Sequence, residues 1–214
     1  MFFVAFLFKN LKSFYVSIKM VFVVIAHYKE DTEWTKNLKY KYKIISRQGI
    51  PFEKPPNRGN EASSYLEYII ENYHNLDDIT IFVHAHRSDW HHKENMDDKI
   101  NRLHFNHAYF NINTNDEGNS LTDLNRFPTE QAKTIQYAPF FEKLLDLKID
   151  PTKIMYRNSA QFYVTKETIQ QYSRDVYIQM FMWLMKVPEH TYYTSRVFEY
   201  FWHIIFTRNH EDVK

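Results

Sequence analysis

Residues 79–86 read ITIFVHAH, an apolar and β-branched run that ends in two histidines one residue apart. A run of this kind is typical of a strand that is covered on both faces within a mostly parallel sheet. VFVVIA at residues 21–26 has the same character, and YKIIS at residues 42–46 predicts a shorter strand. We therefore expect a sheet built around these three runs, with His84 and His86 at the tip of one strand.

Helical patterns separate and follow the predicted strands. Asn60 is a good N-cap residue, and the apolar residues from Ala62 to Tyr73 recur at helical spacing after it. The other expected elements are a helical crossover within 27–38, a strand at 159–164, helices at 139–147, 173–186 and 194–206, and loops with short helices between 93 and 133. Strands that alternate with helices predict an α/β fold, in which helices flank a central, mostly parallel sheet.

Length and composition fit one folded domain. A chain of 214 residues that is 44% hydrophobic and 25% charged is large enough for one core and does not have the composition of a disordered chain. We expect this domain to span residues 20–208, with 209–214 as a tail or as a linker to further domains of a longer chain. Residues 1–19 are expected to pack on the domain as an extension or to precede a natural start at Met20. Their apolar run is too short to span a bilayer.

Charge and residue usage exclude several classes of function. Twenty-seven basic and twenty-six acidic residues give a net charge of +1, so no overall field attracts nucleic acid or an acidic membrane. The chain has no cysteine, which removes disulfides, thiolate catalysis and cysteine zinc sites. It also has only three glycines and neither of the common glycine-rich phosphate motifs. His, Asp and Glu remain as strong metal ligands, and a reducing, cytoplasmic setting is expected.

The histidine pair lies where ligands bind in an open α/β sheet, at the carboxyl end of a strand. Residues two apart on a strand point the same way, so both imidazoles can reach one ion. Packing or hydrogen bonding without a metal is the alternative use of such a pair. The metallo-β-lactamase pattern HxHxDH does not fit, because Asp89 lies three residues beyond His86 and His91 lies five beyond.

Two other enzyme classes carry a metal motif on a strand. Amidohydrolases place HxH on the first strand of a barrel of about 250 residues, and too little chain precedes His84 for that assignment to be simple. A-type glycosyltransferases end an apolar strand of a βαβ sheet in a short metal motif, usually Asp-x-Asp. That class accounts for both the position of the histidines and the predicted sheet.

Three separated blocks resemble a family that is common in fungi and also occurs in bacteria and large viruses. The blocks are TIFVHAHRSDWHH at 80–92, SAQFYVTKETI at 159–169 and SRVFEYFWHIIF at 195–206. This resemblance runs over about residues 21–206, and within it the chain is most similar to the A-type glycosyltransferase domains of chlorella viruses that build the capsid glycan. The resemblance implies an A-type glycosyltransferase fold, a UDP-sugar donor, Mn²⁺, and transfer of rhamnose or another hexose to a glycan or glycoprotein acceptor. It also implies a location in the host cytoplasm if the protein is viral.

The resemblance assigns metal contacts to three histidines. His84 and His86 match the metal motif, with imidazoles in place of the usual carboxylates, and His203 matches a late histidine that contacts the metal or a phosphate. Glu199 and Arg196 share one face of the last helix with His203. A buried ion pair beside a core histidine is the alternative for that group.

Other polar groups near the predicted strand ends suit a nucleotide sugar. The helix that begins near Asn60 favours an anion at its N-terminus, and an exposed aromatic face suits a base. The expected donor-binding residues are Ala26, His27, Tyr28, Arg47, Asn57, Arg58 and Arg87. The expected catalytic residues are Asp89, as the carboxylate near the reacting sugar, and Gln161, as a sugar or acceptor contact.

Two other functions can use the same histidines. A metal-dependent hydrolase would activate a water molecule on the ion. A carbohydrate- or nucleotide-binding module would hold its ligand without catalysis. An inverting transferase needs a general base for the acceptor hydroxyl, whereas a retaining one can work without it. The sequence does not distinguish between these two reactions.

Overall fold

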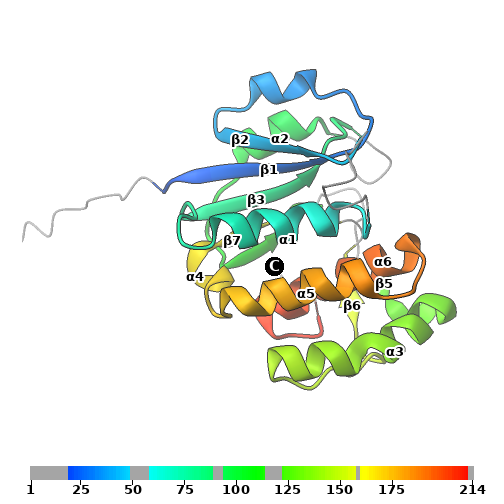
Figure 1. The fold of residues 1–214 in the computed structure, drawn as a ribbon. Coiled ribbons are helices and arrows are strands. Elements are labelled where there is room, and N and C mark those ends of the chain that lie inside the picture. The colour runs from blue at the N-terminus through cyan, green and yellow to red at the C-terminus, as the bar shows by residue number, and fades with distance from the viewer. Residues whose placement is uncertain (1–18, 49–57, 89–93, 114–121, 158–159, 212–214) are drawn as a thin grey trace, which may run out of the picture.

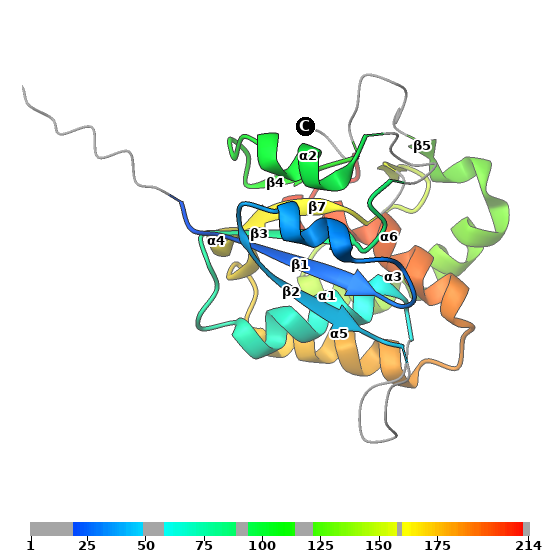
Figure 2. The same ribbon diagram turned by 90° about the horizontal axis from the view of Figure 1, so that it is seen from above.

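The structure is a computed structural model that describes residues 19–48, 58–88, 94–113, 122–157 and 160–211. Five strands form its central sheet in the order β2-β1-β3-β7-β4 (Figures 1 and 2). Their bounds are β1 Val21–His27, β2 Lys41–Ser46, β3 Ile79–His84, β4 Tyr109–Asn111 and β7 Phe162–Thr165. A separate pair joins β5 (Thr122–Asp123) to β6 (Met155–Tyr156).

The sheet is mixed but mostly parallel. β1 pairs in parallel with both β2 and β3, which brings His27, Ser46 and His84 to the same edge. β7 lies between β3 and β4 and is antiparallel to both. The predicted α/β class, with a mostly parallel sheet flanked by helices, is therefore confirmed.

Helices cover both faces of the sheet (Figure 2). One face carries α1 (Glu61–Asn72), α5 (Arg174–Lys186) and α6 (Thr191–Thr207), with α3 (Pro128–Leu145) packed against α6. The other face carries η1 (Glu33–Asn37) and α2 (Met96–Arg102). The remaining short helices are η2 (Leu124–Arg126) and α4 (Lys166–Ile169).

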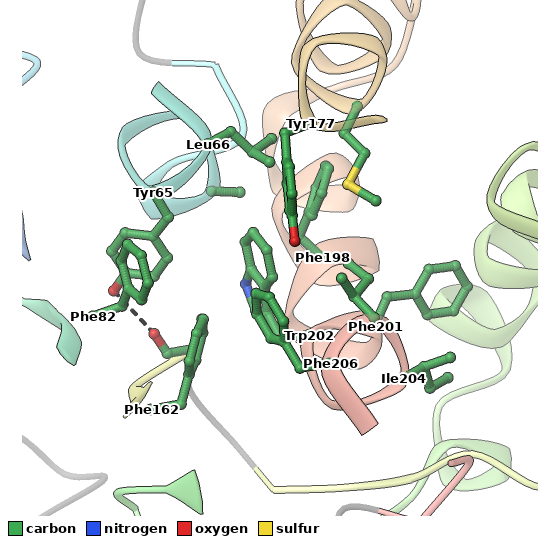
Figure 3. Packing of buried hydrophobic residues seen from close by; sticks show 14 of the residues in the cluster. Tyr65, Leu66, Phe82, Phe162, Tyr177, Phe198, Phe201, Trp202, Ile204 and Phe206 are labelled. Atoms are coloured by element: carbon green, nitrogen blue, oxygen red, sulfur yellow. Dashed lines mark hydrogen bonds between the residues drawn. The ribbon is translucent and has the colours of Figure 1, made fainter. Parts of the chain in front are cut away.

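The larger core is rich in aromatic side chains and centres on α6 (Figure 3). Rings from α1, the sheet and α6 meet there, and we call this group the aromatic core: Tyr65, Phe82, Phe162, Phe198, Trp202 and Phe206. The Tyr65 hydroxyl donates to the Ala160 carbonyl at 2.9 Å. Burial of these large apolar surfaces holds α1 and α6 against the sheet, because removing apolar area from water stabilises the folded state.

Four differences from the sequence-based expectations concern single elements. The crossover between β1 and β2 contains only the short 3-10 helix η1. β4 has three residues and lies in a stretch that we predicted as loops and short helices. α3 starts at Pro128 rather than near Pro139, because proline at the first helical position lacks only a donor that would have no partner anyway. The strand predicted at 159–164 is found at Phe162–Thr165.

Two further expectations concern the chain ends and membranes. Residues 1–18 and 212–214, which include most of the predicted extension and part of the predicted tail, lie outside the described residues. Within the described part of the chain, every helix is too short or too polar to cross a bilayer.

Candidate functional site

A cleft of about 270 Å³ opens at the edge where β1, β2 and β3 end, and we call it the strand-end cleft. It is lined by Ala26, His27, Tyr28, Glu30, Arg47, Asn60, Glu61, Ser64, His84 and His86. Six of these were expected in the site from the sequence: Ala26, His27, Tyr28, Arg47, His84 and His86. Parallel strands end at the same edge of a sheet, so the residues at and just beyond the ends of β1, β2 and β3 lie close together.

The N-terminus of α1 forms one wall of the cleft and is fixed by the loop before it. Arg58 donates from its guanidinium to the carbonyls of Leu184, Val187 and Glu189, where α5 ends. The Gly59 amide donates to Thr191 Oγ1 at 2.8 Å, and Asn60 Nδ2 donates to Ser195 Oγ at 3.1 Å. Arg58 was expected to bind the donor, but it caps α5 and is not among the residues that line the cleft.

Each histidine of the pair faces a carboxylate. His84 Nε2 lies 4.0 Å from Glu61 Oε2, and His86 Nε2 lies 3.5 Å from Glu30 Oε1. The other oxygen of Glu30 accepts the backbone amides of Tyr28 and Lys29 at 2.7 and 3.0 Å, which fixes its carboxylate. Neither glutamate was identified from the sequence. Glu30 lies three residues beyond β1, so a search past each strand end would have found it.

Glu61 is the most strongly perturbed acid of the cleft. Burial and the nearby Glu199 carboxylate raise its pKa to about 8, while Arg196 acts in the opposite direction. Arg196 and Glu199 form an ion pair at 2.5 Å, which is the alternative that the sequence left open for this group. Near neutral pH most of the Glu61 carboxyl groups therefore carry a proton, and Glu61 adds little negative charge to the cleft.

Two smaller or adjoining spaces share walls with the strand-end cleft. A cavity of about 160 Å³ shares Asn60, Glu61 and His84 with it and reaches α6 at Arg196 and Glu199. A wider cavity of about 600 Å³ shares only Glu30 and His86 and continues over η1. Glu30 and His86 thus separate two compartments.

The Gln161 side chain hydrogen-bonds the backbone at the end of β3. Its side chain is fully buried, its Oε1 accepts the His84 amide at 3.1 Å, and its Nε2 donates to Asn113 Oδ1 at 2.9 Å. We expected Gln161 to contact a sugar or an acceptor. The structure instead shows a positioning residue, because both ends of its amide are used to hold the backbone at His84.

Two other expected residues lie away from the cleft. His203 is buried, and its Nε2 hydrogen-bonds the His210 carbonyl at 3.1 Å; burial lowers its pKa to about 4. Arg87 forms a two-point ion pair with the buried Asp97, at 3.1 and 3.0 Å, and lines the wider cavity. The structure therefore does not bring His203 to His84 and His86, and it separates Arg87 from the cleft itself.

Asn57 and Asp89 lie outside the described residues, as does His91. Among the described residues, no group of three or more His, Asp or Glu side chains is spaced to hold a metal ion. The described protein groups alone do not complete a coordination sphere. A cation that also binds substrate phosphates needs only one or two protein ligands, and the pair formed by His86 and Glu30 meets that smaller requirement.

Comparison with known proteins gives one family. The model of a family described as protein of unknown function (DUF3431) matches residues 22–214. No curated protein and no solved structure matches the chain. Since the match covers the sheet, the cleft and the helices around them, the chain belongs to the DUF3431 family.

Proposed function

We propose that this protein is a metal-dependent glycosyltransferase with an A-type fold, which moves a sugar from a UDP-sugar to a glycan acceptor. One observation carries the proposal: the strand-end cleft brings both histidines of the HxH motif together with Glu30 and Arg47 at the carboxyl edge of a mostly parallel sheet. Ligands of open α/β sheets bind at this edge. The resemblance of the three sequence blocks adds the substrate class.

The donor nucleotide would lie along the ends of β1 and β2. The Tyr28 ring is 43% exposed and offers an aromatic face to a base. His27 is held beside it by Ser46 Oγ at 2.8 Å and by the Glu30 carbonyl at 3.1 Å. These contacts fix the rim of the cleft before a ligand arrives, which lowers the entropy cost of binding.

A divalent cation would be held by His86 and Glu30 together with oxygens of the donor diphosphate, while His84 lies at the strand tip beside Glu61. Imidazole and carboxylate together suit Mn²⁺. When bound, the cation neutralises charge on the diphosphate leaving group. The protein groups orient the ligand: the backbone amides of Tyr28 and Lys29 hold Glu30, and Gln161 holds the backbone at His84.

The acceptor would enter through the wider cavity over η1. This cavity meets the strand-end cleft only at Glu30 and His86, so a hydroxyl in it would approach the sugar at that boundary. Its walls combine basic, acidic and amide side chains with the largely buried Trp34, a mixture that suits a polyhydroxylated ligand.

Calorimetric titration with UDP, GDP, CMP and phosphate, each with and without Mn²⁺, tests the proposal. We expect UDP to bind best and to require the cation. His86→Ala should weaken UDP binding in Mn²⁺ by at least tenfold, since one ligand of the cation is lost. His74→Ala is the matched control, because His74 is exposed and lies at the far end of α1.

Equal binding of all nucleotides would contradict the proposal, and so would UDP binding that survives both His86→Ala and His84→Ala. Incubation with UDP-sugars then identifies the reaction. Sugar transferred to an added glycan supports a transferase, whereas release of free sugar whether or not an acceptor is present identifies a hydrolase instead.

A further inference from the structure

We propose that the N-terminus of α1, together with Ser64 and Arg47, forms a site that binds a phosphate group directly, without a cation. The inference deepens the proposed function and rests on it for the identity of the natural ligand, a nucleoside diphosphate sugar. The binding chemistry itself depends only on groups in the strand-end cleft. A phosphate group would then be held from two sides, by this site and by the cation at His86 and Glu30.

Ser64 supplies the first observation. Its side chain is 1% exposed and lines the cleft, and its hydroxyl has no hydrogen-bond partner among the described residues. The neighbouring Ser63 differs, because its hydroxyl donates to the Asn60 carbonyl at 2.9 Å. A buried hydroxyl that forms no hydrogen bond loses its hydration without compensation, so an unmatched one beside a cleft points to a ligand that completes it.

Arg47 supplies the second observation. Its side chain is almost fully buried and one end of the guanidinium pairs with Glu67. The Nε of the same guanidinium is buried and has no partner among the described residues. Arg47 also lines the cleft, so two buried donors without partners border the same space. Guanidinium groups suit phosphate because their N–H donors match its oxygens.

The N-terminus of α1 supplies the field. α1 has twelve residues, and the Asn60 side chain makes no capping hydrogen bond to it. That side chain donates instead to Ser195, on α6. The first amides of a helix and its dipole favour an anion, and here no capping side chain from Asn60 lies over them. The Ala62 amide is already used, because it donates to the Gly59 carbonyl at 3.0 Å.

Two carboxyl groups also line the cleft and limit where a phosphate can lie. Glu30 is turned toward the amides of Tyr28 and Lys29 and toward His86, on the side of the wider cavity. Glu61 lies beside His84. The position next to Ser64 and Arg47 is the part of the cleft in which donors, rather than carboxylates, are unmatched.

Calorimetric titration of the whole chain with inorganic pyrophosphate in EDTA tests the site. We expect the wild-type protein to bind pyrophosphate without a cation. Ser64→Ala should weaken binding by about fivefold, the loss of one hydrogen bond of roughly 1 kcal/mol. Ser63→Ala is the matched control and should change the affinity by less than twofold, because its hydroxyl is already used by Asn60.

Ser64→Cys, of similar size but a weak donor, provides a second variant in case Ser64→Ala does not fold, and it should weaken binding in the same direction. Arg47→Lys should also weaken binding, because lysine keeps the charge but loses the planar set of donors. The inference is overturned if wild-type protein does not bind pyrophosphate in EDTA. It is also overturned if the folded Ser64 variants bind it as tightly as the wild type.

The result is separable from that of the proposed function. Pyrophosphate binding that depends on Ser64, in a protein that does not prefer UDP, supports the phosphate site and contradicts the glycosyltransferase. UDP binding that depends on Mn²⁺ but is unchanged in Ser64→Ala contradicts only the phosphate site.

Discussion

The aromatic core and the strand-end cleft both bury polar groups, but they treat them differently. In the larger core, Tyr65 donates to the Ala160 carbonyl and Tyr177 donates to the Ile169 carbonyl at 2.7 Å. Outside the cleft, the Trp202 indole N–H, Thr80 Oγ1 and Lys99 Nζ also lack partners among the described residues, but none of these residues lines the strand-end cleft. In the cleft, the Ser64 hydroxyl and Arg47 Nε lack partners among the same residues, and the pKa of Glu61 is raised far from its usual value.

This difference shows in which region buried polar groups without partners lower the stability of the fold. Buried polar groups of a core are matched because each unmatched one costs folding free energy. Groups that remain unmatched in a cleft, where a ligand can reach them, are expected at functional sites. The cleft is thus the place where unmatched buried donors and a perturbed acid occur together, which favours it as the functional site without reference to any motif. Three changes test it, and they are ordered from the largest expected effect to the smallest.

Gly59 lies in the loop before α1, between the strand-end cleft and α5. We expect Gly59→Ala to lower the free energy of unfolding by about 2–4 kcal/mol. Gly59 has a φ of +70°, and a Cβ there would lie 2.7 Å from Leu184 Cδ2 and 2.9 Å from Leu184 Cγ. The change therefore adds backbone strain and overpacks α5 against the loop before α1. Urea unfolding at pH 7 measures it.

Asn60→Gly is the control for that loop. Asn60 also has a positive φ, of 49°, which glycine adopts without strain, so the relief of backbone strain offsets part of the lost bond to Ser195. A change below about 1 kcal/mol is expected for it. If Gly59→Ala unfolds as the wild type does, the loop is not packed against α5 as described.

Glu61→Gln tests the cleft by pH. The folded pKa of Glu61 is about 8, above the unfolded value near 4.5, so only the folded state keeps this proton between those values. Wild-type stability from this group is thus lost as pH rises from about 4.5 to 8. Glutamine needs no proton, so the variant should be more stable than wild type at pH 9, by about 1–3 kcal/mol, and nearly equal at pH 4.5. Each tenfold difference in proton affinity between the folded and unfolded states corresponds to ~1.4 kcal/mol, so the full shift sets an upper limit of ~5 kcal/mol, and screening by solvent in the open cleft reduces it to the expected range.

Thermal unfolding of both proteins at pH 4.5, 7 and 9 measures the difference. Glu67→Gln cannot serve as a control because Glu67 pairs with Arg47, whereas Glu71→Gln changes an exposed acid on the same helix. A stability difference between Glu61→Gln and wild type that does not vary with pH would show that Glu61 is not protonated in the cleft.

His203→Gln tests the core with the opposite sign. The folded pKa of His203 is about 4, below the unfolded value near 6.5, so only the unfolded state takes up this proton as pH falls between those values. Stability from this group is lost as pH falls from 6.5 to 4. Glutamine can still donate to the His210 carbonyl, so the variant should be more stable relative to wild type at pH 4.5 than at pH 7.5, by about 1–2 kcal/mol.

The measurement is the difference in urea midpoint between variant and wild type at the two pH values, and His74→Gln, at an exposed histidine just beyond α1, is the control. Binding of UDP in Mn²⁺ should be unchanged in His203→Gln, since His203 does not line the cleft. If His203→Gln lost UDP binding but kept its stability, His203 would be part of the binding site after all.

Much of the fold follows from the sequence because its elements carry strong local patterns. β1, β3, α1, α5 and α6 are found close to where their apolar periods predict them. β4 was missed because three residues, Tyr109–Asn111, carry no period. The antiparallel direction of β7 depends on pairing with β3 at a distance in sequence, which a local pattern does not encode.

Only those residues of the candidate site that lie at strand ends could be predicted from the sequence. The rule that ligands bind at strand ends identified Arg47 and both histidines of the motif. Arg47 and Arg58 were both predicted to bind the donor, yet Arg47 borders the cleft and Arg58 caps α5. The two differ because the loop before α1 is anchored to the junction of α5 and α6. Ser64 and Glu61 enter the site through the orientation of that helix, which only the tertiary packing sets.

The position of β7 between β3 and β4 also constrains how the chain is made. Ile79–Phe82 of β3 pair with Phe162–Thr165, about eighty residues later. During synthesis the first three strands can assemble while this edge of β3 still has no partner in the chain. An unpaired apolar edge is where strands of other molecules add. Productive folding therefore depends on keeping that edge apart from other chains until β7 has been synthesised.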